Sequence, residues 1–241
     1  MTVQDAQSLD ARHTITHAPI SKRTLDLLAS ALGLILLLPA FLIIAAAIRI
    51  DSAGPILFRQ LRVGRRGRHF WMYKFRSMVA GPSHFRAPLT LDKDPRVTRV
   101  GVFLRASKID ELPQLFNVLI GDMSLVGPRP EVPELFAFYT PTQQTAFLSI
   151  RPGMTDYASL LLRDESSLLP CGEDYLTVYR LRLMPIKYQL CERYLREMSL
   201  QADIRIICAT LFALISHRSP DLFLDKRIVR YASDATAERP Y

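Results

Sequence analysis

Apolar residues are most concentrated in one long run, Leu27 to Ile48, which has Pro39 near its middle. A run of this length can cross the hydrocarbon core of a bilayer. Pro39 has no N–H to donate and crowds the preceding helical turn, so we expect a bend there. The two resulting arms, Leu25–Leu38 and Pro39–Ile48, are each too short to fill a core about 30 Å thick.

Basic residues flank this run on both sides. Lys22 and Arg23 precede it, and Arg49 and the arginines of 59–68 follow it. Lys and Arg next to a membrane segment mark its cytoplasmic side. The pattern therefore predicts a re-entrant helix that dips into the membrane, bends at Pro39 and returns to the same face. A kinked helix that spans the bilayer once is the alternative.

The remaining pattern predicts a small β-hairpin and several helices. Ile56–Val63 and His69–Arg76 flank a Gly- and Arg-rich turn, as the two strands of a hairpin do. Apolar residues at helical spacing predict a helix over Asp110–Ile120, with Gly121 at its C-terminal end. Further segments are assigned as follows: a loop at Pro82–Asp94, an irregular stretch at Met123–Pro133, and helices at Pro133–Phe147, Tyr175–Met198 and Leu200–His217.

Composition narrows the possible partners and sites. The net charge of +8 favours anionic partners, which are lipid surfaces, phosphates or nucleic acid. The three cysteines are widely spaced and the five histidines form no metal-ligand pattern, so neither a disulfide framework nor a zinc site is indicated. A reducing cytoplasmic setting is expected.

Two adjacent acids, Asp110 and Glu111, are the main candidates for chemistry. Pro113 belongs in the first turn of a helix, which places both acids at the helix start. One interpretation is structural, since Ser107 and Asp110 have the spacing of a capping box. The other is a phosphate-transfer site, in which one acid attacks phosphorus and the other holds a hard divalent cation. Nearby cations favour the second: Lys74, Arg76, Arg96, Arg99, Arg105 and Arg129.

The cations are expected to have different tasks. Arg129 lies between two prolines, which suits bidentate phosphate recognition, although a solvated arginine in a proline-rich turn is the alternative. Lys74 and Arg76 leave the hairpin on one face and are expected to bind the ligand. The arginines of Arg62–Arg68 are expected to contact anionic lipid headgroups.

Several segments, in order along residues 21–216, carry a resemblance to a known family: Lys22–Asp26, Asp51–Pro55, Phe58–Gln60, Arg62–Gly64, Lys74–Met78, Asp94–Gly101, Asp110–Gln114, Gly121–Pro130 and Arg151–Thr155. Taken together, they resemble the bacterial sugar transferases, the monotopic phosphoglycosyl transferases that start glycan assembly on polyprenyl phosphate. The chain is similar to the short form of that family. One residue and one segment differ from those of many relatives. Leu38 stands in place of a serine, and Thr155–Ser159 replaces a Thr-Gly-Trp-Ala-Gln run.

The resemblance implies a mechanism. Asp110 would attack the β-phosphate of a UDP-sugar, release UMP and form a covalent phosphosugar–aspartate, which undecaprenyl phosphate then attacks. Glu111 would help to bind Mg²⁺, and Lys74, Arg105 and Arg129 would hold the phosphates. This reaction would be the first membrane step in making exopolysaccharide, capsule, O-antigen or glycoprotein glycans. The donor sugar would be selected by Pro82–Lys93 and Tyr157–Glu173.

The expected fold is α+β and mostly helical, with a small hairpin and the Pro-broken membrane helix. Its parts are an N-terminal arm (1–20), the membrane helix (21–50), a catalytic domain with interfacial helices (51–218) and a C-terminal tail (219–241). We expect it in the bacterial inner membrane, with the active site on the cytoplasmic face, membrane lipids as partners and no nucleic acid. A homodimer is an open possibility. The competing hypothesis is a non-enzymatic, membrane-tethered adaptor whose basic face binds lipid or nucleic acid.

Overall fold

The structure, a computed structural model, describes residues 20–79, 94–162, 175–216 and 224. It confirms a mostly helical α+β fold with two small sheets. The expected arm at 1–20, the loop at Pro82–Asp94 and the tail at 219–241 lie outside the described residues, except at Ile20, Asp94 and Leu224.

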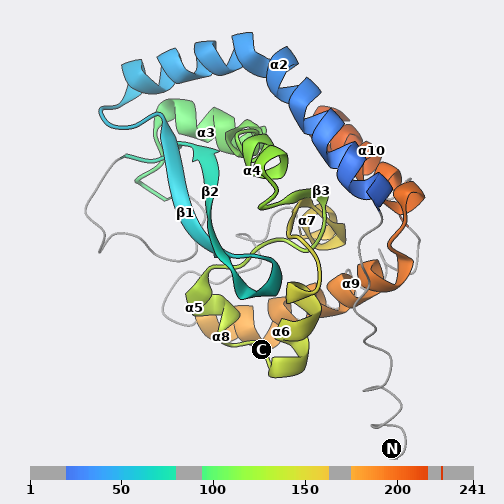
Figure 1. The fold of residues 1–241 in the computed structure, drawn as a ribbon. Helices are drawn as coiled ribbons and strands as arrows, with labels where there is room; N and C mark the ends of the chain where they lie inside the picture. Colours follow the sequence, from blue (N-terminus) through green and yellow to red (C-terminus); the bar gives the residue numbers. More distant parts are fainter. Residues whose placement is uncertain (1–19, 80–93, 163–174, 217–223, 225–241) are drawn as a thin grey trace, which may run out of the picture.

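The apolar run forms one long helix, α2, which extends from Ile20 to Asp51 and contains Pro39. The helix is longer at both ends than the apolar run and continues through Pro39. Figure 1 shows it as two arms that run in different directions. A proline inside a helix is a recognised cause of such a bend. In the described part of the chain, α2 is the one helix long and apolar enough to cross a membrane.

The side chains of α2 show the reverse of the pattern found on a helix of a soluble protein, in which apolar side chains are buried and polar ones are exposed. Its buried side chains include the polar groups of Lys22, Asp26 and Ser30, whereas Leu28 and Ile35 are 67% and 70% exposed. Exposed leucines and isoleucines on one continuous surface are unfavourable in water and favourable in lipid. Lys22, Asp26 and Ser30 therefore face the protein, and the exposed apolar residues of α2 suit a bilayer.

The predicted hairpin is confirmed. β1 (Leu57–Val63) and β2 (His69–Phe75) are antiparallel and joined by a short 3₁₀ turn, η1, at Arg65–Gly67. The end of β2 packs on the C-terminal arm of α2, because the Phe75 ring lies 5.2 Å from the Phe41 ring in an edge-to-face contact. The hairpin is thus fixed against the membrane helix.

The helix expected at Asp110–Ile120 is divided. A helix without a sequence prediction, α3, covers Arg99–Ala106, and a 3₁₀ turn, η3, covers Ile109–Glu111. The α-helix α4 begins only at Gln114 and ends at Ile120, with Gly121 as the expected C-cap at φ 98°. Pro113 causes this division, because it is tolerated at a helix start and not within one.

One buried amide attaches α4 to the hairpin. The Asn117 side chain accepts from the Tyr73 backbone N–H at 3.0 Å and donates to the Trp71 carbonyl at 2.8 Å. It therefore completes backbone hydrogen bonds at the edge of β2. The two acids Asp110 and Glu111, called the dyad below, lie just before α4. They are therefore held next to β2, the strand that carries Lys74.

The described part of the C-terminal half contains a parallel strand pair and further helical segments. β3 (Ser124–Val126), which lies in the stretch expected to be irregular, pairs with β4 (Gly153–Thr155). The helix expected at Pro133–Phe147 is divided into two helices. The second begins at Pro141, and Thr140 caps it with a capping box. The helical segments are α5 (Pro133–Phe136), α6 (Pro141–Leu148), α7 (Tyr157–Leu161), α8 (Tyr175–Val178), α9 (Met184–Glu197) and α10 (Leu200–Ser216). A π-helical segment, η5, joins α8 to α9 at Tyr179–Leu183.

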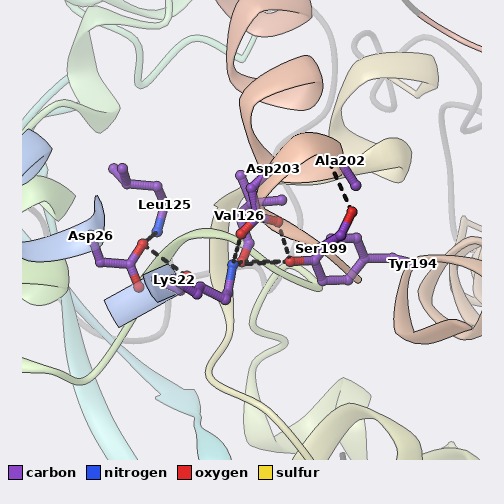
Figure 2. Close-up of polar contacts among 9 residues, drawn as sticks. Lys22, Asp26, Leu125, Val126, Tyr194, Ser199, Ala202 and Asp203 are labelled. Carbon is purple, nitrogen blue, oxygen red and sulfur yellow. Dashed lines mark hydrogen bonds and ion pairs between the residues drawn. The ribbon is translucent and has the colours of Figure 1, made fainter. Parts of the chain in front are cut away.

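The N-terminal arm of α2 is attached to this half by a buried network. The Lys22 ammonium donates to the Val126 carbonyl (2.8 Å), the Tyr194 hydroxyl (2.9 Å) and the Asp203 carboxylate (2.7 Å), as Figure 2 shows. One turn later, Asp26 accepts from the Leu125 N–H at 2.8 Å. The first turns of α2 therefore hold β3 and α10 through buried charges, and Figure 1 shows α10 beside that arm.

We predict that Lys22→Met lowers the free energy of unfolding by about 3–5 kcal/mol, because it leaves the buried Asp203 carboxylate without its cation. Adding Asp203→Leu should recover more than half of that loss, since the unpaired charge is then gone. Arg193→Gln, which removes an ion pair on the surface of α9, should change the value by less than about 1 kcal/mol. Denaturation in detergent, followed by the fluorescence of the single tryptophan, Trp71, measures all three. If Lys22→Met and the double variant with Asp203→Leu lost the same free energy of unfolding, the prediction would be contradicted.

Candidate active site

The two acids lie on the tight turn between α3 and α4. Ser107 ends α3 and donates its hydroxyl to the Phe103 carbonyl at 2.7 Å. Lys108 then takes a left-handed conformation at φ 59°, which is uncommon for a residue with a side chain. Ser107 therefore caps the end of α3 and does not cap a helix that starts at Asp110, so the capping-box interpretation is wrong.

Glu111 is held between two cations. Its carboxylate accepts from Lys74 Nζ at 2.8 Å and from Arg129 Nη1 at 3.0 Å, and a second Arg129 nitrogen also contacts it. Burial alone would raise the pKa of Glu111, but the charges and hydrogen bonds of Arg129 and Lys74 leave it well below its ordinary value of 4.5. Glu111 is therefore ionised and fixes both cations in place.

Asp110 has the opposite environment. It is only 6% exposed, and among the described residues its Oδ1 atom has no hydrogen-bond partner. Burial raises the pKa of the Asp110 carboxyl above 3.8, and the charge of Lys74 opposes part of that rise. A buried carboxylate oxygen without a partner is costly unless a ligand uses it. Asp110 is therefore the group of the pair that is available to react.

Both acids line a cavity of about 1570 Å³. Its polar wall carries cations, with Lys74, Arg105 and Arg129 among them, so it suits phosphate groups. Other parts of the wall are apolar and come from two long helices, with Leu37 of α2 and Leu211 of α10 as examples. One cavity thus combines an anion-binding region with a surface for hydrocarbon.

The structure brings most of the predicted ligand-binding residues together. Lys74 and Arg129 touch Glu111, and Arg105 lines the cavity and lowers the pKa of Asp110 by its charge. Arg96 also lines the cavity, with its guanidinium paired to Asp94 at 2.9 Å. Arg99 is exposed and is not part of the cavity wall.

Arg76 has a further structural task. Its guanidinium donates to the carbonyls of Ser52 (2.6 Å), Ala53 (3.0 Å) and Ile48 (3.3 Å), so it caps the C-terminal end of α2. Lysine and arginine satisfy exposed carbonyls at helix ends in this way. Arg76 also lines the cavity, and its role in substrate binding stays a prediction.

Sequence reasoning missed two residues beside the dyad. Arg62, expected at lipid headgroups, lines the cavity and donates to the Pro130 carbonyl at 2.8 Å. The alternation of side chains along a strand could have revealed the position of Arg62, because the hairpin pairing puts residues 58, 60 and 62 on the same face as Lys74. Asp156 accepts from the Arg129 backbone N–H at 3.2 Å and from the Ser159 N–H at 2.6 Å. It supports the loop that carries Arg129, which only the fold reveals.

A metal ion would find a partial set of ligands at the dyad. Among the described residues no three or more His, Cys, Asp or Glu side chains gather at one point. Mg²⁺ is usually held by one or two carboxylates together with substrate phosphates. Asp110, with its partner-free oxygen, and Glu111 meet that requirement once a diphosphate supplies the other ligands.

The chain is similar in sequence to known proteins. Residues 17–217 match the model of the bacterial sugar transferase family. An undecaprenyl-phosphate glucose phosphotransferase from Komagataeibacter xylinus is 39% identical over 204 residues, which are 80% of this chain and 35% of the relative. UDP-glucose:undecaprenyl-phosphate glucose-1-phosphate transferases from Klebsiella pneumoniae and Caulobacter vibrioides are 38% and 39% identical over 80% and 82% of this chain. The chain spans 40% of the first of these two and 70% of the second.

We predict that Glu111→Gln lowers the free energy of unfolding by about 3 kcal/mol at pH 7, because Lys74 and Arg129 lose their shared anion. The folded-state pKa of Glu111 is depressed below 4.5. Its contribution is therefore present above pH 4.5 and is lost as the pH falls through the folded-state value. Wild type and variant should converge on acidification, as measured by Trp71 fluorescence in denaturant. The exposed Glu134→Gln control should differ little from wild type at any pH, and a gap that stays constant for Glu111→Gln would refute the assignment.

Proposed function

Because this chain belongs to the bacterial sugar transferase family, we propose that it moves a sugar-1-phosphate from a UDP-sugar to undecaprenyl phosphate and releases UMP. The observation that carries the proposal is the pair of contrasting carboxylates in one cationic cavity. Asp110 has an oxygen without a partner, and Glu111 is bound by Lys74 and Arg129. Phosphoryl transfer depends on positioning and charge neutralisation, and this arrangement supplies both.

The proposed reaction has two steps, both at Asp110. First, a carboxylate oxygen of Asp110 bonds to the β-phosphorus of the UDP-sugar, the bond from that phosphorus to the bridging oxygen breaks, and UMP leaves with the electron pair. Second, an oxygen of undecaprenyl phosphate attacks the same phosphorus and the bond to Asp110 breaks. The product is undecaprenyl diphosphosugar, and the carboxylate is restored.

The cations and Glu111 hold the phosphates for both steps. Lys74 and Arg129 are fixed by Glu111, so they meet the diphosphate with little loss of side-chain freedom. Arg105 adds charge on the same wall. We propose that Glu111, together with the diphosphate, would hold Mg²⁺, which would supply positive charge to the leaving group.

Contacts at both ends of α2 support the re-entrant arrangement. At the N-terminal end Lys22 binds Asp203, and at the C-terminal end Asp51 accepts from the Val100 N–H at 3.0 Å. Both partners belong to the domain that follows α2 in the chain. Because a domain of this kind lies on one side of a bilayer, these contacts support a topology in which both ends of α2 are on that side. A helix that spans the membrane once would separate them.

This topology places the cavity beside the membrane surface. Its apolar lining includes Leu37 of α2 and Ile207 of α10, where the prenyl chain of the acceptor can pack. The positive charge of membrane-flanking residues puts this face in the cytoplasm, and so the inner membrane of a bacterium is the proposed location. The glycan pathway that receives the product and the homodimer stay predictions.

We predict that Asp110→Asn abolishes UMP release, with a fall of at least about a thousandfold, because the amide cannot serve as the nucleophile. Wild type mixed with a UDP-sugar and Mg²⁺ but no lipid should gain one phosphosugar on the peptide that contains Asp110. Mass spectrometry detects this adduct, and a UDP-sugar panel with undecaprenyl phosphate and a UMP assay gives the rate.

The matched control is Asp122→Asn, an Asp outside the cavity wall, which should keep the wild-type rate. Asp110→Asn should still fold and bind vesicles. If wild type releases no UMP from any UDP-sugar, or if Asp110→Asn is as active as wild type, the enzyme proposal fails. Salt-sensitive binding of lipid or nucleic acid would then favour the adaptor.

We also predict that both flanks of α2 are on the same side of the membrane. Single cysteines introduced as Asp5→Cys and Arg65→Cys, in a background without the three native cysteines, should react with an impermeant maleimide from the same side of sealed vesicles. Leu36→Cys, in the exposed apolar part of α2, should be protected by lipid. Labelling of positions 5 and 65 from opposite sides would show a spanning helix.

A further inference from the structure

A second buried polar cluster contributes two of its three residues to the wall of the same cavity, and the proposed reaction does not use it. Glu131 accepts a hydrogen bond from the Tyr179 hydroxyl at 2.8 Å and pairs with Lys187 Nζ at 3.2 Å. Lys187 also donates to the Tyr179 hydroxyl at 3.0 Å, which closes a triangle. We call these three residues the Glu131 cluster. Glu131 and Lys187 line the cavity together with Asp110.

Arg62 lies between the Glu131 cluster and the phosphate-binding residues. It lines the cavity, and burial lowers the pKa of its guanidinium, on which the charges of Glu131, Arg129 and Glu111 also act. Its guanidinium donates to the carbonyl of Pro130, the residue between Arg129 and Glu131. The cluster is therefore next to the place where the diphosphate would bind.

Unsatisfied polar atoms surround the cluster. Among the described residues, Arg62 Nε and Tyr139 Oη are buried and have no hydrogen-bond partner. Tyr139 is 3% exposed, and the charges of Glu131 and Lys187 both act on its hydroxyl. Buried polar groups in native proteins are almost always satisfied, so a ligand or ordered water in this region is expected.

Stability alone is a weak reason for such a cluster. A buried ion pair is often no more stabilising than well-packed apolar residues of similar size. Tyr179 also begins the π-helical segment η5, and short π-helical segments are frequent at functional sites. Burial alone would raise the pKa of the Glu131 carboxyl, but Lys187 and Arg62 leave it below the ordinary value of 4.5. The carboxylate is thus a charged acceptor beside charged and neutral donors.

The cluster suits a neutral ligand that both donates and accepts hydrogen bonds. The charges of Glu131 and Lys187 cancel, so the cluster has no net attraction for a phosphate, unlike the region around Lys74 and Arg129. Hydroxyl groups match it, because each one donates to a carboxylate and accepts from an ammonium or phenol. Of the three parts of a UDP-sugar, the hexose presents the most hydroxyl groups on one ring.

We propose that Glu131 and Lys187, oriented by the buried hydroxyl of Tyr179, form the subsite that binds the hydroxyl groups of the donor sugar and selects among UDP-sugars. This inference rests on the proposed function, since it assigns part of the same cavity to the same donor. It also gives the selection of sugar to described residues in the cavity wall. The two segments expected from the sequence were Pro82–Lys93, which lies outside the described residues, and Tyr157–Glu173, of which 163–173 lie outside them.

The test compares two UDP-hexoses that differ at one hydroxyl, UDP-glucose and UDP-galactose, and measures the ratio of their kcat/KM values. Glu131→Gln should change that ratio about tenfold, the effect of one lost hydrogen bond to a charged group. The affinity for UMP, which has no hexose, should stay within about twofold. Tyr179→Phe removes one donor without changing charge and should shift the ratio in a smaller step.

The matched control is Glu192→Gln on α9. Glu192 accepts from the Tyr188 hydroxyl at 2.7 Å and lies outside the cavity wall. It should leave both the ratio and the UMP affinity unchanged. If Glu131→Gln does not fold, Tyr179→Phe and Lys187→Met give the same comparison.

Three outcomes would overturn the inference. Weaker UMP binding with an unchanged ratio would assign the cluster to the nucleoside. An unchanged ratio and unchanged UMP affinity, with a lower thermal stability, would make the cluster purely structural. If the rates with UDP-glucose and UDP-galactose changed by the same factor, the cluster would affect the positioning of any donor and would not select among sugars. Failure of wild type to release UMP from any UDP-sugar is a separate result, which rejects the proposed function itself.

Discussion

Buried polar groups at both ends of α2 hold a helix whose remaining surface is apolar and exposed. Lys22 and Asp26 attach one end to β3 and α10, and Arg76 caps the other end through the carbonyls of 48–53. Apolar contacts could not provide this attachment, because lipid competes equally well for leucine and isoleucine. Charged and hydrogen-bonded contacts have no such competitor in the hydrocarbon. The position of the whole domain on the membrane depends on them.

The same elements that attach the membrane helix also position the phosphate-binding residues. β3, held by Lys22 and Asp26, leads directly into the loop with Arg129, and that loop crosses β4 at two glycines. A Cβ on Gly127 would lie 2.6 Å from a backbone oxygen, and one on Gly153 would lie 2.1 Å from a backbone nitrogen. Neither glycine can be replaced without moving a strand. The arginine that binds Glu111 is therefore fixed relative to the bilayer through rigid backbone.

Neighbouring carboxylates acquire different chemistry because their surroundings differ. Glu111 is paired with two cations, whereas Asp110 is buried with one oxygen lacking a partner. Sequence patterns predicted the hairpin, the bent apolar helix and the membership of both acids in one cationic site, because alternation, proline and local charge are visible in the chain. They did not predict α3, the division at Pro113, or the tasks of Arg62 and Asp156. Those depend on contacts between residues far apart in the sequence, which no local pattern records.

The span between Lys22 and Asp203 has a consequence for biosynthesis. The two residues are 181 positions apart, so a ribosome that adds about 5–20 residues per second completes the second roughly ten to forty seconds after the first. During that interval α2 has emerged, but the partner of its lysine has not been translated. The nascent helix must therefore rest in the bilayer, or on a chaperone, before its docking surface exists. The contact that fixes the N-terminal end of α2 therefore forms only after Asp203 of α10 has been translated.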